Sequence, residues 1–238
     1  MAETSAAEAG TAEPAAAQAA APAARAAPAP ADRWFEAPVL AGDHVRLEPM
    51  SLAHAEGLAA AADDEVFEHL RISRVPRTRE EGEAFVRSVL AQRDKRVLLP
   101  WTQLDAVTGE VAGTTSYYEI DPTLRTVAIG HTWLGRRWWR TGVNTEAKLL
   151  LLRLAFDDLG AVRVVWHTDI RNERSQAAIA RLGAQREGVL RKHRLRRDGS
   201  WRDTVQFAMT DDDWPRVRDR LSARLRPSAF PADTPATT

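Results

Sequence analysis

Residues 125–160 read RTVAIGHTWLGRRWWRTGVNTEAKLLLLRLAFDDLG. The first part, Arg125–Leu134, is an extended stretch of apolar and β-branched residues and predicts a strand. After a loop that holds three arginines, Gly142–Leu159 is dense in leucine and predicts a helix. Gly160 follows as the type of residue that most often stands just beyond a helix C-terminus. The basic loop between strand and helix is therefore the segment with the clearest chemical character.

This loop and the start of the helix after it have the properties of an anion site. The first amides of a helix have no partner within the helix and carry partial positive charge. Arg136, Arg137 and Arg140 stand beside these amides in sequence, and Gly142 lets the backbone come close to a ligand. The pattern predicts a phosphate or pyrophosphate site. An ordinary strand-to-helix loop whose arginines face water would show the same residues.

Strands and helices alternate on both sides of this segment. Further strands are expected at 44–49, 97–104, 110–118, 161–168, 189–195 and 203–210, and further helices at 51–62, 78–93 and 172–182. The order is β-α-α-β-β-β-α-β-α-β-β, with an antiparallel meander in its middle. It predicts one α/β (α+β) domain with helices flanking a mostly antiparallel sheet.

Both ends of the chain differ in composition from this domain. Residues 1–31 contain 17 alanines and four prolines, which break any long helix. We expect a disordered tail over 1–33, the folded domain over 34–222 and a second disordered tail over 223–238. The first tail carries acidic residues and lacks the leucine-rich core of a signal peptide, so a cytoplasmic location is expected.

Composition excludes several classes of protein. Lys+Arg and Asp+Glu are 33 each, a zero net charge that argues against a strongly basic nucleic-acid-binding protein. The chain has no cysteine, which excludes a disulfide scaffold, a thiolate zinc site and a cysteine nucleophile. No apolar run reaches the ~18 residues of a membrane span. The six histidines show no metal-ligand spacing, so no metal is expected.

Several motifs, in order, resemble the GNAT superfamily of acetyl-CoA-dependent N-acetyltransferases, in the branch with the RimJ/RimL-type protein N-terminal acetyltransferases. The matching stretches are IGHTWLG (129–135), WRTGVNTEAKLLLL (139–152), RVVWHTD (163–169), NERSQAAIARLGA (172–184), EGVLR (187–191) and RDTVQFAMTDDDW (202–214). The resemblance implies the GNAT fold, in which the strands at 125–134 and 161–169 begin as a parallel pair and then splay apart.

The resemblance also implies acetyl-CoA as the co-substrate. The pyrophosphate loop of the family usually reads [Q/R]-x-x-G-x-[G/A], and WRTGVN at 139–144 retains its central glycine. In this fold the pantetheine arm lies in the gap between the splayed strands and pairs with the backbone of the first one. The implied cofactor-binding residues are Thr132, Trp133, Leu134, Arg137, Trp139, Arg140, Thr141, Gly142, Val143, Asn144, Asn172 and Ser175.

An acetyltransferase of this family works by direct attack of an amine in a ternary complex, without an acyl-enzyme. In its N-x-x-S element, Asn172 lies beside the cofactor arm and the Ser175 hydroxyl protonates the departing thiolate. Asn172 would equally serve as a helix N-cap, with Ser175 an ordinary residue of the first turn.

The general base is less defined by the pattern. Relatives often carry an acidic residue just before the Ile-Gly of the central strand, where this chain has Ala128. Glu119 is the catalytic candidate because it ends an apolar strand. The alternatives are His131, Asp169, His193 and a chain of water molecules.

The acceptor is the least determined part. The run RKHRLRR at 191–197 fits a solvated hairpin face, or a patch for an acidic substrate, a CoA phosphate or RNA. A basic rim favours a peptide or protein N-terminus with acidic neighbours over a polycationic amine. A small-molecule amine, a non-catalytic acyl-CoA-binding module and a ribosome-associated RNA-binding protein stay open, the last being least compatible with zero net charge. Dimers are common among relatives, so a homodimer is a candidate state.

Overall fold

The computed structural model describes residues 27–67 and 75–226 of the chain. One eight-stranded sheet runs through it in the order β1-β2-β3-β4-β5-β6-β8-β7, and β5–β6 is its parallel pair. The strands are β1 (Leu40–Ala41), β2 (Val45–Pro49), β3 (Leu98–Asp105), β4 (Val111–Asp121), β5 (Thr126–Leu134), β6 (Arg163–Asp169), β7 (Gln185–Leu195) and β8 (Trp201–Thr210). The predicted class, a mostly antiparallel sheet flanked by helices, is confirmed.

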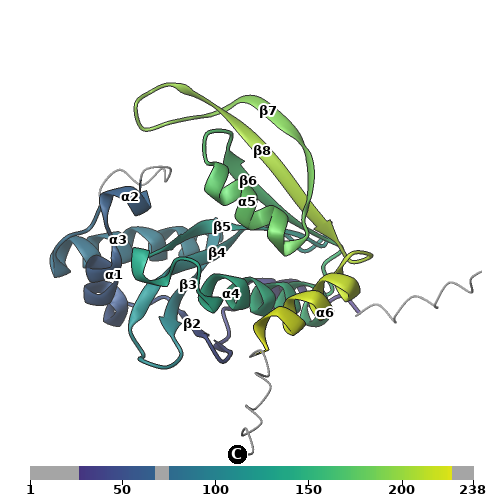
Figure 1. Cartoon of the computed structure of the whole chain (residues 1–238), viewed down its shortest axis with the longest axis horizontal. Helices are drawn as coiled ribbons and strands as arrows, with labels where there is room; N and C mark the ends of the chain where they lie inside the picture. Colours follow the sequence, from purple (N-terminus) through teal and green to yellow (C-terminus); the bar gives the residue numbers. More distant parts are fainter. Residues whose placement is uncertain (1–26, 68–74, 227–238) are drawn as a thin grey trace, which may run out of the picture.

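The helices lie on both faces of this sheet (Figure 1). They are α1 (Ala55–Ala61), α2 (Asp64–Phe67), α3 (Arg79–Asp94), α4 (Gly142–Arg153), α5 (Glu173–Leu182) and α6 (Trp214–Leu225), with 3-10 turns η1 (Ala31–Phe35), η2 (Leu52–His54) and η3 (Arg136–Trp138) and a π-helical turn η4 (Leu154–Asp158). Helices α1 and α3 pack over β3 and β4, whereas α4 packs on β2 and α6. Helix α5 covers β6 and β8.

The parallel pair separates after three residues. Thr126, Val127 and Ala128 of β5 pair with residues 163–165 of β6, and the pairing goes no further. Beyond this point β6 stays paired with β8 and β5 stays paired with β4, so the sheet opens between β5 and β6. The register between β5 and β4 shifts between Thr114 and Ser116, opposite His131, whose φ is +49°. A bulge of this kind bends a strand, and it accounts for the predicted splay.

Alternation along β5 assigns neighbouring side chains to opposite faces of the sheet. Trp133 is 4% exposed and packs against Phe67 and Phe85 at ring-centroid distances of 5.1 and 6.5 Å. Thr132 points the other way, toward α4. The face above α4 therefore presents a polar side chain at the very point where the sheet opens.

The domain extends further at both ends than the expected limits of 34 and 222. The Ala29 amide donates to the Leu159 carbonyl at 3.1 Å, and η1 buries Trp34, so residues 27–33 belong to the folded part. Helix α6 was not predicted and continues to Leu225, because Val217 and Leu221 give it a buried apolar face. The remainder of the two predicted tails lies outside the described residues.

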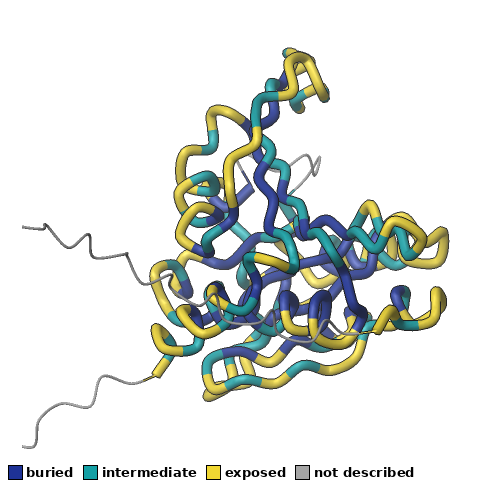
Figure 2. The backbone as a smooth tube through the Cα atoms, turned by 90° about the vertical axis from the view of Figure 1, so that its right-hand side faces the viewer, coloured by how far each residue is buried: buried dark blue, intermediate teal, exposed yellow. Residues whose placement is uncertain are grey.

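Three further boundaries differ from expectation. Helix α4 ends at Arg153 and its predicted last turn is the π-helical η4. Strands β7 and β8 start at Gln185 and Trp201, earlier than predicted, and their hairpin extends away from the body of the molecule with a largely exposed tip (Figure 2). Across 27–67 and 75–226, no helix combines the length and the apolar character that crossing a membrane requires.

Candidate functional site

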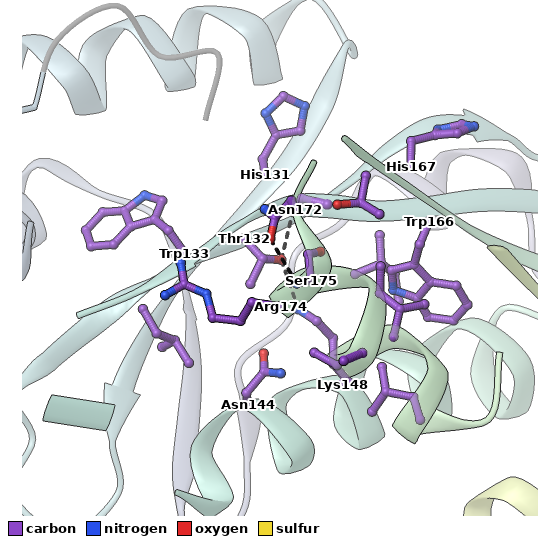
Figure 3. Close-up of a pocket in the computed structure, with 18 of the residues that line it drawn as sticks. His131, Thr132, Trp133, Asn144, Lys148, Trp166, His167, Asn172, Arg174 and Ser175 are labelled. Atoms are coloured by element: carbon purple, nitrogen blue, oxygen red, sulfur yellow. Dashed lines mark hydrogen bonds between the residues drawn. The ribbon is translucent and has the colours of Figure 1, made fainter. Parts of the chain in front are cut away.

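A cavity of about 1130 Å³ opens where β5 and β6 part, beside the first turn of α4 and the first turn of α5. It collects most of the residues predicted for the site (Figure 3). The predicted residues that line it are Glu119, Thr132, Trp133, Leu134, Trp139, Arg140, Thr141, Asn144, Asn172 and Ser175. Four separate segments of the sequence, from β4, β5, the η3–α4 loop and α5, thus meet at one place.

The first turn of α4 presents backbone amides to this cavity. Thr141 is the N-cap: its hydroxyl oxygen accepts from the Val143 amide at 3.3 Å and its O–H donates to the Trp138 carbonyl at 2.8 Å. Arg140, which precedes the cap, has a left-handed φ of +63° and lines the cavity together with Asn144. The loop is therefore fixed in a conformation that leads directly into a helix start, the arrangement expected of an anion site.

Gly142 and Val143 do not line the cavity with side chains, contrary to the simplest form of the prediction. A Cβ on Gly142 would lie 2.6 Å from the His44 ring, so packing against His44 already explains the glycine. Val143 is buried in the core at 3% exposure. The Val143 amide already donates to the Thr141 hydroxyl, so of these two residues only Gly142 has an amide without a hydrogen bond described above.

A buried carboxylate anchors α4 to the sheet. Glu146 accepts from the amides of Asp43, His44 and Val45 at 3.0, 2.6 and 2.9 Å. It is 6% exposed, and a Cβ on Gly42 would come within 2.4 Å of its oxygens. The segment before β2 is thereby attached one turn into α4, which fixes the position of the helix start relative to the cavity.

The arginines of the loop are not equivalent. Arg137 is absent from the cavity lining and pairs with Glu110 at 2.7 Å, so a role of its side chain in binding the cofactor stays a prediction. Arg140 lines the cavity. Arg174 of α5, which the sequence pattern did not single out, also lines it, and its guanidinium lies 3.8 Å from the Trp139 ring centroid. Arg140 and Arg174 are the arginines of the lining beside the first turns of α4 and α5, and Arg174 also lies 4.0 Å from Glu65.

Trp139 connects Arg174 of this lining to β5. Its indole N–H donates to the Leu134 carbonyl at 2.7 Å. One of the two lone pairs of that carbonyl is therefore already in use. The backbone groups of Thr132 face the edge of β5 that is open toward β6. The Trp133 carbonyl faces the opposite edge of β5, where it accepts from the Gln103 side chain at 3.4 Å. The expected backbone partners for a pantetheine arm lie along this edge.

Both readings of the N-x-x-S element are compatible with the geometry. The Asn172 side chain caps α5 by accepting from the Ser175 amide at 2.9 Å, as predicted for an N-cap. Ser175 lies at the cavity and is partly exposed there. The cap leaves the Ser175 hydroxyl oriented by a rigid first turn, while its amide is already occupied.

Glu119 lines the cavity from β4. It has a left-handed φ of +49°, and its carboxylate is 3.2 Å from the Arg194 guanidinium and 3.7 Å from Nδ1 of His167. His167 also bonds the Tyr118 hydroxyl at 3.0 Å and Gln206 at 3.1 Å. The result is a connected polar group at the mouth of the cavity, in which His167 was not predicted.

The other three side chains considered as the general base differ in their position and in their hydrogen bonds. His131 lines the cavity at the bulge. Asp169 also lines it, but its carboxylate is held by Arg196 at 2.6 and 2.9 Å. Burial raises the pKa of Asp169, yet the hydrogen bonds from Arg196 and the Arg171 amide outweigh it and lower the pKa. A carboxylate so stabilised is a poor base. His193 lies outside the cavity lining.

Two residues of the basic run at 191–197, Arg194 and Arg196, contact acidic residues of the cavity lining. Both residues form the ion pairs described above, with Glu119 and Asp169. The run therefore joins the hairpin to the site and is more than a solvated face. Little of its charge at these two positions remains for an external polyanion.

Lys148 is the feature that the sequence pattern did not reveal. It lies among the leucines of α4, where a lysine would ordinarily face water, yet it is 5% exposed and lines the cavity. Its ammonium donates to the hydroxyls of Thr115 and Thr132 at 2.8 and 2.9 Å. Burial lowers the pKa of Lys148 to about 7.

Comparison with known proteins agrees with this geometry. Residues 44–185 match the family model for the acetyltransferase (GNAT) domain. A solved GCN5-related N-acetyltransferase from Brucella melitensis is 30% identical, with a TM-score of 0.76 over 83% of this chain and 89% of that one.

Curated relatives match as well. The [ribosomal protein uS5]-alanine N-acetyltransferase of Escherichia coli is 33% identical over 81 residues, 34% of this chain and 41% of that one. The uncharacterized N-acetyltransferase YoaA of Bacillus subtilis is 26% identical over 72% of this chain and 96% of its own length. The chain spans between 41% and 57% of the length of the first curated relatives it matches.

Proposed function

Because the chain belongs to the GNAT acetyltransferase family, we propose that it transfers an acetyl group from acetyl-CoA to the α-amino group of a protein N-terminus. The single observation that supports this most is the parting of β5 and β6 directly beside the capped start of α4. A nucleotide thioester needs both features, an amide-lined anion site and a strand edge for its arm.

The cavity residues fit the charges and shape of CoA. The amides at the start of α4, with Arg140 and Arg174 near them, suit the pyrophosphate. The free edge of β5 from Thr132 to Leu134 suits the amides of the pantetheine arm. Asn144 and Thr141 lie between these two regions and offer side-chain hydrogen bonds. Trp139 and Asn172 also belong to the lining of the cavity.

Ser175 and Glu119, which both line the cavity, suit the two proton transfers of the reaction, one to the leaving sulfur and one from the attacking amine. Ser175, on the first turn of α5, is placed to donate to the departing thiolate. Glu119 is placed to take the proton from the incoming amine, with His167 and Tyr118 hydrogen-bonded nearby. Bringing donor and acceptor together in one cavity removes the need for an acyl-enzyme, since proximity alone accelerates such a step strongly.

The choice of a protein acceptor rests on the relatives. The Escherichia coli relative is named for the alanine of ribosomal protein uS5. A small-molecule amine and a non-catalytic acyl-CoA module are the competing functions. Since acetyl-CoA and nascent protein N-termini share the cytoplasm, we place the reaction there.

The test is release of free CoA thiol from acetyl-CoA in the presence of peptides with free N-termini. Acetylation must depend on the peptide and must appear as a mass increase on its α-amino group. The matched control is the same peptide with a blocked N-terminus. Thiol release with small amines alone would favour the small-molecule function, and binding without release would favour the non-catalytic module.

A further inference from the structure

Lys148 is a buried cation without a buried anion. Among the described residues none of the ion pairs includes it, and its two partners are the neutral hydroxyls of Thr115 and Thr132. These two hydroxyls also bond each other at 2.9 Å, so the three groups form a closed triangle. Figure 3 shows the Lys148 side chain reaching from α4 to Thr132 at the opening of the sheet.

The charged groups around this cavity have other partners. Glu119 faces Arg194, and Asp169 is held by Arg196. Glu65, the third acid of the lining, pairs with Arg136 at 3.1 Å and lies 4.0 Å from Arg174. The other titratable residues of the lining are not carboxylic acids; they are Tyr118, His131, His167, Arg140, Arg181, Arg202 and Arg224. The carboxylates that could neutralise Lys148 are thus committed elsewhere. A buried charge with no counter-charge is costly, and proteins retain it where a ligand supplies the opposite charge.

A buried donor that lacks a partner also lies at this cavity. The indole nitrogen of Trp166 is buried and has no hydrogen-bond partner among the described residues, and Trp166 lines the cavity from β6. Buried donors normally find acceptors. Lys148 from α4 and Trp166 from β6 therefore both offer hydrogen-bond donors to a group that would sit in the gap between the splayed strands.

The location along α4 identifies that group. Lys148 is six residues beyond Gly142, about 9 Å along the helix axis from the amides proposed for the pyrophosphate. It approaches the strand edge at Thr132, where the far end of a pantetheine arm would reach. The group opposite Lys148 is then the sulfur end of the co-substrate and not its phosphates.

We propose that Lys148 is a catalytic residue whose ammonium stabilises the negative charge that develops on the CoA sulfur during transfer. This inference rests on the proposed function. In the step concerned, the acceptor nitrogen bonds to the thioester carbon and the carbon–sulfur bond breaks. Its electron pair goes to sulfur, opposite Lys148, and a proton from Ser175 completes the thiol. The acceptor nitrogen loses its proton to Glu119, and solvent restores the protons.

The lowered pKa of Lys148 is compatible with this role, because burial disfavours the ammonium only while no anion lies beside it. Negative charge that develops on the nearby sulfur favours the protonated form and interacts strongly with it, since water is excluded. Thr115 and Thr132 orient the ammonium without neutralising it. A carboxylate in their place would cancel the charge on which the effect depends. The leucines around Lys148 on α4 keep water out and the interaction strong.

The experiment compares the pKa of the thiol of bound CoA in the wild-type chain and in Lys148→Met, followed by the ultraviolet absorbance of the thiolate. We expect the thiol pKa to be lower in the wild type by about one to three units. Lys95→Met, which removes an exposed lysine, is the matched control and should behave as the wild type. Equal thiol pKa values in wild type and Lys148→Met would overturn the proposal.

Calorimetry on the same samples separates the two proposals. If the wild type binds CoA and only the thiol pKa comparison fails, the role of Lys148 is wrong while the proposed function stands. If the wild type does not bind CoA, both are wrong. Should Lys148→Met fail to fold, Lys148→Gln provides the same comparison, with an uncharged side chain that keeps a donor for the threonines.

Discussion

The pH dependence of stability is the sharpest consequence of burying Lys148. The pKa of this amine is 10.5 in an unfolded chain and about 7 in the folded one, where burial is the cause. Each pKa unit corresponds to ~1.4 kcal/mol, so carrying the proton into the folded state costs about 5 kcal/mol. The two hydroxyl partners accept from the amine in either protonation state and do not remove this cost.

The direction of this pH dependence is determined by which state, folded or unfolded, binds the Lys148 proton. Between about pH 7 and about pH 10.5 the unfolded chain carries the Lys148 proton and the folded chain does not. The free energy of unfolding therefore rises with pH across this window, by ~1.4 kcal/mol per unit. Lys148→Met has no proton to lose and lacks this contribution. From about pH 7.5 to about pH 9.5, the wild type should gain 2 to 3 kcal/mol relative to the variant.

Chemical denaturation at several pH values measures this difference. Other titrating groups are common to both chains and cancel in the comparison, and Lys95→Met should track the wild type. Parallel pH profiles for wild type and Lys148→Met would refute the reasoning, because they would mean that Lys148 keeps its proton in the folded state.

Three further changes test the neighbouring parts of the site. Glu146→Ala leaves three amides, one of them buried and two part-buried, without their acceptor and should lower the free energy of unfolding by about 3 kcal/mol. Glu146→Gln, which keeps one of the two oxygens, should cost roughly half, and denaturant titration distinguishes them. Gly142→Ala should weaken CoA binding in calorimetry because its Cβ meets the His44 ring, and His44→Ala in the same chain should restore binding; no restoration would place the clash elsewhere. Ser175→Ala should lower kcat by about 100-fold with the acetyl-CoA Kd nearly unchanged, and an unaltered kcat would remove Ser175 from the proton transfer.

The elements that the sequence predicted well are those with local signals. The helix expected over 78–93 is α3, which Thr78 caps by accepting from the Glu81 amide, and the β5–β6 pair followed from the family resemblance. Helix α6 was missed because its apolar positions, Val217 and Leu221, are few and stand among arginines. The π-helical turn after Arg153 has no sequence signature and depends on how the chain packs.

The candidate site likewise contains residues that the sequence indicated and residues that only the structure shows. Residues that belong to a motif, such as Asn172 and Ser175, were assigned to the site from the family resemblance, and both line the cavity. Lys148 was not, because a lysine among leucines reads as the polar face of a helix, and only the packed structure shows that it points to Thr115 and Thr132. The ion pair of Arg137 with Glu110 could not be predicted for a similar reason, since the two residues are distant in sequence.

Calorimetric titration of the purified chain with acetyl-CoA tests the central claim most directly, namely that the opening between β5 and β6 holds this thioester. The account predicts saturable binding of one molecule per chain, weakened by replacing Arg140 and Arg174 with alanine, the two arginines that line the cavity near α4. An absence of binding heat at all temperatures tried, or binding that ignores both arginines, would contradict it.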